Sequence, residues 1–300
     1  MEIFENIVKI DNLALALGFF DGAHKGHQAV ILSAVNYANE NNKKSAVITF
    51  NQNPLEFFSK QKFQRIITKE DRRAKIQALG IDYIFELDFN EKFSKLSGIE
   101  YLRDILVKNF KPISISTGFN HNFGANKSGD AKLLEDMQTE FNYKYFNTPA
   151  EKLDGEIISS TLIREYLLNG NVPKANSMLG YNYSISGTVI TGQQLGQKIG
   201  FPTANVEYPK ELIELPYGVY STIITIEGDS KEYPSITNFG KKPTVCKNCV
   251  PTIEVNIFNF DKNIYNKKIK ISFVKKIRDE QKFNSIEELK TKIKEDITKC

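Results

Sequence analysis

The sequence predicts an α/β domain followed by an antiparallel β domain, either a barrel or a sandwich, and a C-terminal helix. Strand-like and helix-like segments alternate over the first half of the chain, which is typical of a parallel sheet covered by helices. After residue 182, short segments rich in Val, Ile, Thr, Phe and Tyr follow one another closely and are separated by Gly, Pro or Asn. This second pattern favours antiparallel strands. Residues 285–297 place apolar side chains at helical spacing.

The first half opens with an apolar run over residues 13–20 that ends in Gly-Phe-Phe-Asp-Gly, so we expect a buried strand entering a loop. The same alternation predicts strands at 46–50 and 113–117 and helices at 26–40, 69–79 and 99–107. Polar N-cap candidates and a following glycine predict two short helices, at 159–168 and 173–179.

The second half predicts a different arrangement. We expect strands at 183–190, 218–226, 233–238, 252–260 and 268–274, and one amphipathic helix at 285–297. The change in composition near residue 182 predicts two domains, residues 1–182 and residues 183–300.

Charge and hydropathy narrow the class of protein. The chain has 40 basic and 36 acidic residues spread along its 300 residues, with a formal net charge of +4. This balance argues against a nucleic-acid partner, whereas small anionic substrates need only a local cationic pocket. No apolar run is long enough to cross a bilayer, and the N-terminus lacks the features of a signal peptide. We therefore expect a cytoplasmic protein with no membrane partner, and the sequence predicts no oligomeric state.

Two of the three cysteines, Cys246 and Cys249, have CxxC spacing. A structural zinc site usually needs a second pair, and the chain has none. A redox pair would be expected at a helix start, whereas this one lies in a predicted loop. Chance spacing in a loop is the favoured interpretation, and metal binding and redox chemistry stay open as alternatives.

The most informative motif is GFFDGAHKGH, residues 18–27, which begins where the first apolar strand ends. Gly22 and Gly26 allow a ligand to approach the backbone closely, and the segment that follows is helical. Free N–H groups and the helix dipole favour phosphate at such a helix start. His24 and His27 are three residues apart, so on a first helical turn they share a face and can reach the same triphosphate.

This motif resembles the HxGH motif of the nucleotidyltransferase superfamily, and more narrowly the N-terminal module of the bacterial bifunctional riboflavin kinase/FMN adenylyltransferase (FAD synthetase) family. TGFNHNFG at 117–124, followed by SGD at 128–130, resembles the family's flavin- and nucleotide-contacting loop, and SSTLIR at 159–164 resembles its SSTxIR motif. The resemblance implies catalytic roles for His24, His27 and Arg164. It implies ATP binding by Gly18, Phe19, Gly22, Gly26, Ser160 and Thr161, and flavin binding by Asn120, Asn122 and Phe123.

One stretch departs from the family pattern. TFNQNP at 49–54 stands where the family usually has a TFxPHP-like sequence, so Gln52 replaces the first proline and Asn53 replaces the histidine. Asparagine can exchange hydrogen bonds with a phosphate but carries no charge. This departure concerns phosphate contacts or the rate of the first domain, and leaves its fold unaffected.

A second glycine-rich segment, residues 187–206, contains no P-loop, because GxxxxGK[ST] is absent. It resembles the flavokinase motif GxxLGxxxGFPTAN. The resemblance implies that Gly192 and Gly196 bind ATP and that Thr203 and Asn205 serve both ATP and Mg²⁺, for which both residues offer hard oxygen donors. Gln197 stands where the family usually has arginine.

Residues 253–260 alternate as a strand, with Glu254 on the face opposite Ile253 and Val255. The matching glutamate of the family is the general base that takes the proton from the ribityl 5′-hydroxyl of riboflavin. Arg278 resembles the family's flavin-side arginine. Phe283 could cover the isoalloxazine ring or belong to the core, and the sequence leaves both possibilities open.

The resemblance runs from about residue 13 to residue 297 and keeps the family's order of motifs. It implies a Rossmann-like α/β nucleotidyltransferase domain followed by a small antiparallel flavokinase-like β-barrel with a C-terminal helix. The implied reactions convert riboflavin and ATP to FMN and ADP, and FMN and ATP to FAD and pyrophosphate, with ATP as co-substrate and Mg²⁺ as cofactor. The alternatives are a riboflavin kinase with an impaired adenylyltransferase domain and a non-enzymatic flavin-binding regulator.

Overall fold

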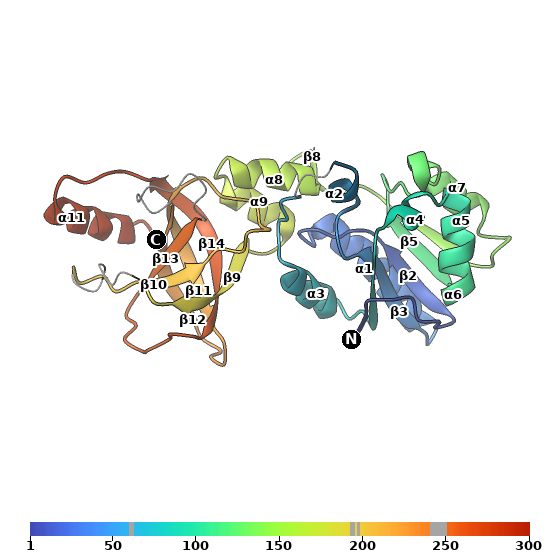
Figure 1. The fold of residues 1–300 in the computed structure, drawn as a ribbon, viewed down its shortest axis with the longest axis horizontal. Coiled ribbons are helices and arrows are strands. Elements are labelled where there is room, and N and C mark those ends of the chain that lie inside the picture. The colour runs from blue at the N-terminus through green and yellow to red at the C-terminus, as the bar shows by residue number, and fades with distance from the viewer. Residues whose placement is uncertain (60–62, 193–195, 197–198, 241–250) are drawn as a thin grey trace. The chain divides into compact units, whose positions relative to one another are not determined.

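The computed structural model describes residues 1–59, 63–192, 196, 199–240 and 251–300. The chain divides into two compact units, Met1–Ser159 and Ser160–Cys300, which are described separately (Figure 1). Gln197, Cys246 and Cys249 lie outside the described residues, so the interpretations of the Gln197 departure and of the CxxC pair stay as predictions. Among the described residues, no helix combines the length and the apolar character needed to span a membrane.

The first unit is built on a six-stranded parallel sheet with the strand order β1-β4-β3-β2-β5-β6. Its strands are β1 (Glu2–Phe4), β2 (Leu13–Leu17), β3 (Lys44–Phe50), β4 (Tyr83–Leu87), β5 (Ser114–Gly118) and β6 (Lys144–Thr148). β2 is buried along its whole length and pairs with β3 on one side and β5 on the other. The strand order therefore reverses at β2 and β5, and ligands of open α/β sheets bind outside the carboxyl ends of strands at such a switch point.

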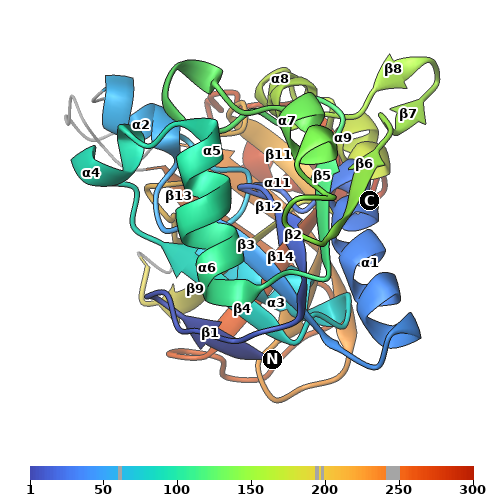
Figure 2. The same ribbon diagram turned by 90° about the vertical axis from the view of Figure 1, so that its right-hand side faces the viewer.

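Helices cover both faces of this sheet (Figure 2). On one face α1 (Lys25–Glu40) buries Val30, Ile31 and Ala34, and α3 (Lys69–Ala78) adds Ile76 to the same core. The other face packs against one helical segment made of α5 (Gly98–Glu100), a π-helix (Tyr101–Val107) and α6 (Lys108–Phe110). The smaller elements are α2 (Pro54–Ser59), α4 (Glu91–Ser94), a 3₁₀ turn (Ala125–Lys127), α7 (Ala131–Asp136) and the hairpin of β7 (Lys152–Leu153) and β8 (Glu156–Ile157).

The second unit is a closed antiparallel barrel preceded by α8 (Ser160–Leu168) and α9 (Val172–Leu179). The barrel order is β10-β13-β12-β11-β14-β9, and the pairing of β9 with β10 completes the ring. Its strands are β9 (Ser184–Ile190), β10 (Ala204–Glu207), β11 (Gly218–Ile226), β12 (Glu232–Gly240), β13 (Thr252–Ile257) and β14 (Lys268–Asp279). Closure decides between the two antiparallel arrangements that the composition left open, in favour of the barrel.

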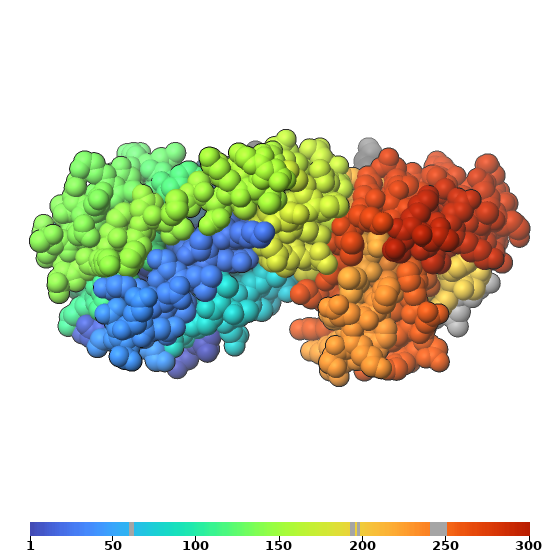
Figure 3. All heavy atoms as spheres, turned by 180° about the vertical axis from the view of Figure 1, so that it is seen from behind, coloured from blue at the N-terminus to red at the C-terminus, as the bar shows by residue number. Residues whose placement is uncertain are grey.

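Two features attach helices to the barrel. Asn176 of α9 donates from Nδ2 to the carbonyl oxygen of Phe273 (2.9 Å) and accepts the N–H of Tyr183 (2.7 Å), so α9 is anchored to β14 and to the start of β9. The C-terminal helix α11 (Ile286–Ile297), dark red in Figure 3, lies on the surface of this unit and buries the Asp296 side chain. The predicted fold class is therefore confirmed in both halves of the chain.

Candidate active sites

The loop between β2 and α1 carries the GFFDGAHKGH motif and follows the sheet at its switch point. Gly22 has a φ of 80°, in the left-handed region that favours glycine, and Ala23 closes the turn with a hydrogen bond from its N–H to the carbonyl oxygen of Phe20 (3.0 Å). His24 is the N-cap of α1, since its Nδ1 accepts the N–H of His27 (3.3 Å). The loop therefore places both histidines at the start of α1. They lie beside the backbone N–H groups that the first turn of a helix offers to a ligand.

The two imidazole rings are stacked, with ring centroids 3.6 Å apart and an interplanar angle of 19°. The edge of Phe20 supports His27 from the side, at a centroid distance of 5.3 Å. Gly26 keeps the space beside this pair open, since a Cβ there would lie 3.3 Å from Cε1 of His24. The structure thus brings the two predicted histidines together as a stacked pair.

The loop after β5 contains the three predicted flavin contacts. Asn120 and Asn122 are exposed, and Asn122 donates to the carbonyl oxygen of Asn120 (2.9 Å). Phe123 is half-buried, with its ring centroid 5.5 Å from that of Tyr101, and a Cβ at Gly129 would lie 2.4 Å from the Phe123 ring. Phe123 therefore anchors this loop, while the two asparagines face solvent.

The SSTLIR motif lies at the start of α8. Ser160 is the first residue of that helix and Arg164 follows one turn later, so the two side chains share a helix face. α8 belongs to the second compact unit, and the roles of Ser160, Thr161 and Arg164 at the His24 loop stay predictions. Within the first unit, the carbonyl oxygen of Ile158 would lie 3.9 Å from a Cβ at Gly26, so the chain passes the loop shortly before it reaches Ser160.

Gln52 and Asn53, which depart from the family pattern, both form hydrogen bonds within the local structure. Asn53 accepts the N–H of Leu55 at its Oδ1 (2.9 Å) and so caps α2, and Gln52 donates to the carbonyl oxygen of Phe89 (2.8 Å). Asn53 is buried, with 8% of its surface exposed. Its capping role accounts for an amide at this position, where Oδ1 is occupied by the N–H of Leu55.

The barrel places its predicted residues in register on one surface. Glu254 of β13 lies directly opposite Asn205 of β10 and opposite Asn238 of β12. Residues opposite each other on antiparallel strands share a sheet face, with Cβ atoms about 5 Å apart. Ile253 and Val255 are fully buried, so Glu254 points away from the barrel core, as the alternation predicts.

The glycine-rich segment lies against the same residues. A Cβ at Gly192 would lie 2.2 Å from Nδ2 of Asn205, and a Cβ at Gly196 would lie 3.1 Å from Oγ1 of Thr203. The segment turns tightly, since the N–H of Phe201 donates to the carbonyl oxygen of Gly196 (2.8 Å). Only glycine leaves room for this approach, so the predicted ATP residues from both ends of the motif form one site.

Asn256 is a residue of this site that the sequence analysis missed. Its Nδ2 donates to the carbonyl oxygen of Pro202 (2.7 Å), which fixes the segment that carries Thr203. Asn256 is two residues after Glu254 and therefore lies on the same face of β13. Its spacing of two residues from Glu254 was the feature of the sequence that could have identified Asn256.

The donor set of the barrel site fits a magnesium ion. Thr203 and Asn205 supply neutral oxygen atoms, and Mg²⁺ typically takes one or two protein ligands together with substrate phosphates. No group of three or more His, Cys, Asp or Glu suited to a metal occurs among the described residues. A metal here would therefore depend on the phosphates of a nucleotide for much of its coordination.

Arg278 and Phe283 are also brought together. The Arg278 Nε donates to Oδ2 of Asp296 on α11 (2.7 Å), and its Nη1 donates to the carbonyl oxygen of Asp279 (2.9 Å). The guanidinium carbon lies 5.6 Å from the centroid of the half-buried Phe283 ring, within cation–π range. Asp296 is 1% exposed and was not predicted.

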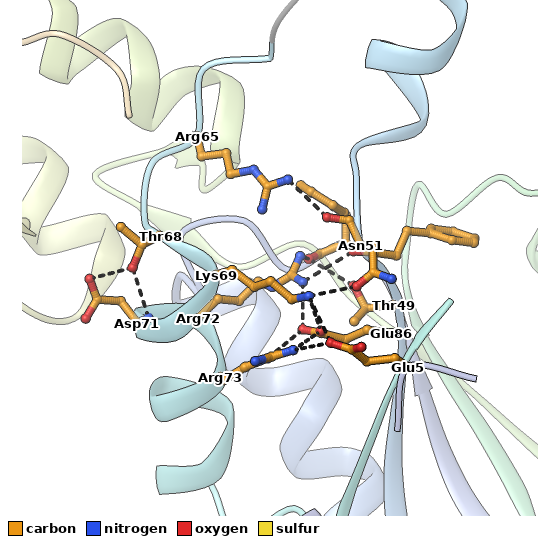
Figure 4. A network of polar contacts seen from close by, with 12 residues as sticks. Glu5, Thr49, Asn51, Arg65, Thr68, Lys69, Asp71, Arg72, Arg73 and Glu86 are labelled. Atoms are coloured by element: carbon orange, nitrogen blue, oxygen red, sulfur yellow. Dashed lines mark hydrogen bonds and ion pairs between the residues drawn. The ribbon is translucent and has the colours of Figure 1, made fainter. Parts of the chain in front are cut away.

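The sequence analysis also missed residues that lie next to the first site. The carboxylate of Asp21 is buried and accepts the N–H of Ile66 with both oxygens, each at 3.1 Å. Arg72, Arg73, Lys69 and Glu86 form an ion cluster (Figure 4), and Arg72 joins it to the loop by donating to the carbonyl oxygen of Phe19 (3.0 Å). Two features of the sequence could have indicated this cluster. Arg72 lies one turn before the apolar Ile76 on α3, and Glu86 places a charge within a buried strand.

An aromatic group near the ends of β3 and β4 was also missed. It consists of Phe50, Phe57, Phe58, Phe89 and Phe93, which pack edge to face or tilted. Phe58 is 64% exposed and so gives this group an open apolar surface. Such rings can contact a flat heteroaromatic ligand.

Two family models match this chain, one in each half. A family model described as FAD synthetase matches residues 8–162, and one described as riboflavin kinase matches residues 179–300. A bifunctional riboflavin kinase/FMN adenylyltransferase of Buchnera aphidicola is 36% identical over 97% of this chain and 94% of that protein. Its namesake in Bacillus subtilis is 37% identical over 94% of this chain and 89% of that protein, and the one in Escherichia coli K12 is 33% identical over 95% and 91%.

A solved structure supports the fold over the full length. It is described as a macrolide-efflux protein from Streptococcus pneumoniae, with a TM-score of 0.87, 29% identity, and coverage of 99% of this chain and 97% of that one. The matches to the two family models and to full-length relatives cover both halves of the chain. The chain therefore belongs to the family of bifunctional riboflavin kinase/FMN adenylyltransferases.

Proposed function

We propose that this chain phosphorylates riboflavin to FMN in its barrel and adenylylates FMN to FAD in its α/β domain. The observation that carries the proposal is the presence of two separate sites suited to phosphate, the stacked His24 and His27 at a helix start and the Glu254–Asn205 pair beside Gly192. We assign these activities to residues 1–182 and 183–300, and we place the protein in the cytoplasm.

In the kinase reaction, Glu254 would take the proton from the ribityl 5′-hydroxyl of riboflavin. The hydroxyl oxygen then forms a bond to the γ-phosphorus of ATP, the bond to the β–γ bridging oxygen breaks, and ADP leaves. Thr203 and Asn205 would hold the phosphates, with Gly192 and Gly196 providing close backbone approach. Mg²⁺ bound through Thr203 and Asn205 would neutralise charge on the phosphates.

Arg278 and Phe283 would form the flavin side of the kinase site. The hydrogen bond to Asp296 and the contact with the Phe283 ring hold the guanidinium in one orientation. A planar cation beside an aromatic ring can contact the polar edge of an isoalloxazine while the ring covers its face.

In the adenylyltransferase reaction, a phosphate oxygen of FMN would attack the α-phosphorus of ATP, and pyrophosphate would leave as the bond to the bridging oxygen breaks. No covalent enzyme intermediate is needed, so the protein acts by aligning the reactants and by stabilising charge. His24, His27 and Arg164 would stabilise that charge. Gly18, Phe19, Gly22, Gly26, Ser160 and Thr161 would bind ATP, and Asn120, Asn122 and Phe123 would contact the flavin.

A second candidate is a riboflavin kinase whose adenylyltransferase domain is impaired. The capping of α2 by Asn53 favours it, because Oδ1 of this amide is engaged by the N–H of Leu55. The stacked histidine pair and the glycine turn favour the bifunctional enzyme, since neither is needed for the fold of the barrel.

Product analysis decides between these functions. Purified protein is incubated with riboflavin, ATP and magnesium, and the flavins are separated by chromatography. FAD formation supports the bifunctional enzyme, and accumulation of FMN alone supports the kinase with an impaired first domain. Flavin binding without turnover would overturn both and leave a non-enzymatic binding protein.

A further inference from the structure

One buried guanidinium links three adjacent strands of the first sheet at their carboxyl ends (Figure 4). Arg72 of α3 is 2% exposed and donates to the carbonyl oxygen of Phe19 (3.0 Å), just after β2. It also donates to the carbonyl oxygen of Phe50 at the end of β3 (3.3 Å) and to Oε1 of Glu86 on β4 (3.2 Å). This is the edge of the sheet at which α/β folds bind their ligands.

Phe19 is held more firmly than an ordinary loop residue. Its carbonyl oxygen accepts a second hydrogen bond, from Oγ1 of Thr49 (3.3 Å), and its ring lies 4.9 Å from the guanidinium carbon of Arg72. The next residue, Phe20, has a φ of 58°, so the chain turns sharply here on its way to His24. Arg72 therefore fixes the point from which the GFFDGAHKGH loop starts.

Burial of Arg72 is compensated by Glu86. Burial lowers the pKa of Arg72, and the adjacent Glu86 carboxylate opposes that shift. The Glu86 side chain is fully buried, which disfavours its charge, but hydrogen bonds from Arg73 and Lys69 and the charge of Arg72 outweigh burial and hold the pKa of Glu86 below its ordinary value. The cluster is therefore ionised at neutral pH, with Glu86 as a fixed counter-ion.

Arg73 provides an internal comparison. It donates from Nε to Oε1 of the same Glu86 (3.1 Å), and its Nη2 lies 3.6 Å from Oε1 of Glu5. Its side chain is 23% exposed, and within the described part of the chain its hydrogen bonds go to Glu86. Arg73 thus shares the ion cluster with Arg72 without holding the loop.

We propose that Arg72 is a positioning residue for adenylyl transfer, which holds the Phe19 carbonyl and so aligns residues 18–27 with the ATP phosphates. This inference rests on the proposed ATP-binding role of that loop. The planar fork of arginine can reach three acceptors in different directions at once, whereas a lysine ammonium on its flexible stem cannot match that geometry. A buried ion pair often adds little stability over an apolar replacement, so stability alone explains this arrangement poorly.

The test compares Arg72→Lys with Arg73→Lys in the full-length protein. Each variant is assayed for FAD formation from FMN over a range of ATP concentrations, for riboflavin phosphorylation, and for thermal unfolding. We expect Arg72→Lys to lower kcat/KM for adenylylation by roughly 10- to 100-fold, as small misplacements at a reacting centre do, while riboflavin phosphorylation is unchanged. Arg73→Lys should keep adenylylation within about twofold, because within the described part of the chain the hydrogen bonds of Arg73 go to Glu86 and not to Phe19.

Equal loss of thermal stability in both variants, with adenylylation equally retained in both, would reduce Arg72 to a structural residue and overturn the inference. Thr49→Val gives a second route, because it removes the other hydrogen bond to Phe19 and should weaken adenylylation in the same direction. Hydrogen exchange of backbone amides 18–27 adds a readout that needs no turnover. ATP should protect these amides in the wild type and less so in Arg72→Lys.

The measurements distinguish failure of the proposed ATP-binding role of the loop from failure of the proposed role of Arg72. A wild-type protein that makes no FAD, and whose amides 18–27 gain no protection from ATP, refutes the proposed role of the loop and this inference with it. Wild-type FAD synthesis together with equal protection in wild type and Arg72→Lys refutes only the role of Arg72.

Discussion

Asn205 on β10 and Glu254 on β13 are direct partners across two antiparallel strands of the barrel. They are far apart in the sequence, yet the register gives them one sheet face and places Gly192 against the Asn205 amide. A carboxylate and the amide proposed to bind phosphate are therefore adjacent, as the proposed transfer of a phosphoryl group to a hydroxyl requires.

The first prediction concerns this carboxylate. Glu254→Gln should lower the rate of FMN formation by roughly two decades or more, because it removes the proposed general base while keeping size and hydrogen bonding. Conversion of added FMN to FAD should be unchanged, and both products are measured by chromatography. Glu207→Gln, at an exposed glutamate on the neighbouring β10, is the matched control and should behave like wild type. Retained FMN formation in Glu254→Gln would remove this residue from the catalytic set.

The second prediction concerns His27, whose loss should affect FAD synthesis and leave riboflavin phosphorylation unchanged. His27→Ala should lower FAD synthesis from FMN by roughly two decades or more, because it removes a group proposed to stabilise charge on the phosphates in the transition state. Riboflavin phosphorylation in the same preparation serves as the control for a folded protein. Undiminished FAD synthesis would show that the stacked pair is not required for adenylyl transfer.

The third prediction is steric. Gly192→Ala places a methyl group where it would lie 2.2 Å from Nδ2 of Asn205, so the amide has to move. Riboflavin phosphorylation should fall by roughly 10- to 100-fold, since about 1 Å of misplacement can cost that much. Gly228→Ala is the control, because a Cβ there meets nothing within 4 Å and its φ of 80° should cost stability alone. Equal kinase activity in both variants would contradict a close approach of Gly192 to Asn205.

The fourth prediction is a pH dependence of stability. Burial lowers the pKa of His121 from 6.5 to about 4, and among the described residues its buried Nε2 has no hydrogen-bond partner. The unfolded chain therefore binds a proton more readily than the folded one. The contribution of the neutral His121 to the free energy of unfolding is fully present above about pH 6.5. It is lost as the pH falls toward 4, and it amounts to at most about 3 kcal/mol.

His121→Phe keeps a ring beside Phe123 and removes the titration. Urea unfolding of both proteins at pH 7 and pH 5 measures the effect, and the variant should lose less stability between the two values than wild type. The carboxylates titrate in both proteins and so cancel in the comparison. Identical pH profiles would show that His121 is protonated freely in the folded state.

Much of the fold follows from local patterns. The strand before the first motif, the helix after it and the alternation around Glu254 are set by side chains close together in the sequence, and the structure confirms all three. The strands β1, β4, β6 and β10 were not predicted, and of these β1 and β10 contain too few residues to establish a period. The π-helix at Tyr101–Val107 was predicted only as helix, since apolar spacing does not distinguish the two hydrogen-bonding patterns.

The parts of the sites that could not be predicted depend on pairing across the chain. The register of β10 with β13 places Asn205 opposite Glu254, and no local pattern encodes which residues of two strands meet. The bonds from Arg72 to Phe19 and Phe50 are likewise invisible in sequence, because carbonyl acceptors are present at every residue. Motif resemblance proposed the residues of the sites, whereas their neighbours in space could be found only from the structure.

Closure of the barrel has a consequence for biosynthesis. The ring is complete only when β14 pairs with both β9 and β11, and β14 begins at residue 268. All six strands of the first sheet have been synthesised by residue 148, so that sheet can form while the ribosome is still translating the barrel. A nascent or truncated chain that stops before β14 leaves β9 and β11 with open edges, which are templates for aggregation. Translational pausing or premature termination between β11 and β14 would therefore expose strand edges that the complete barrel covers.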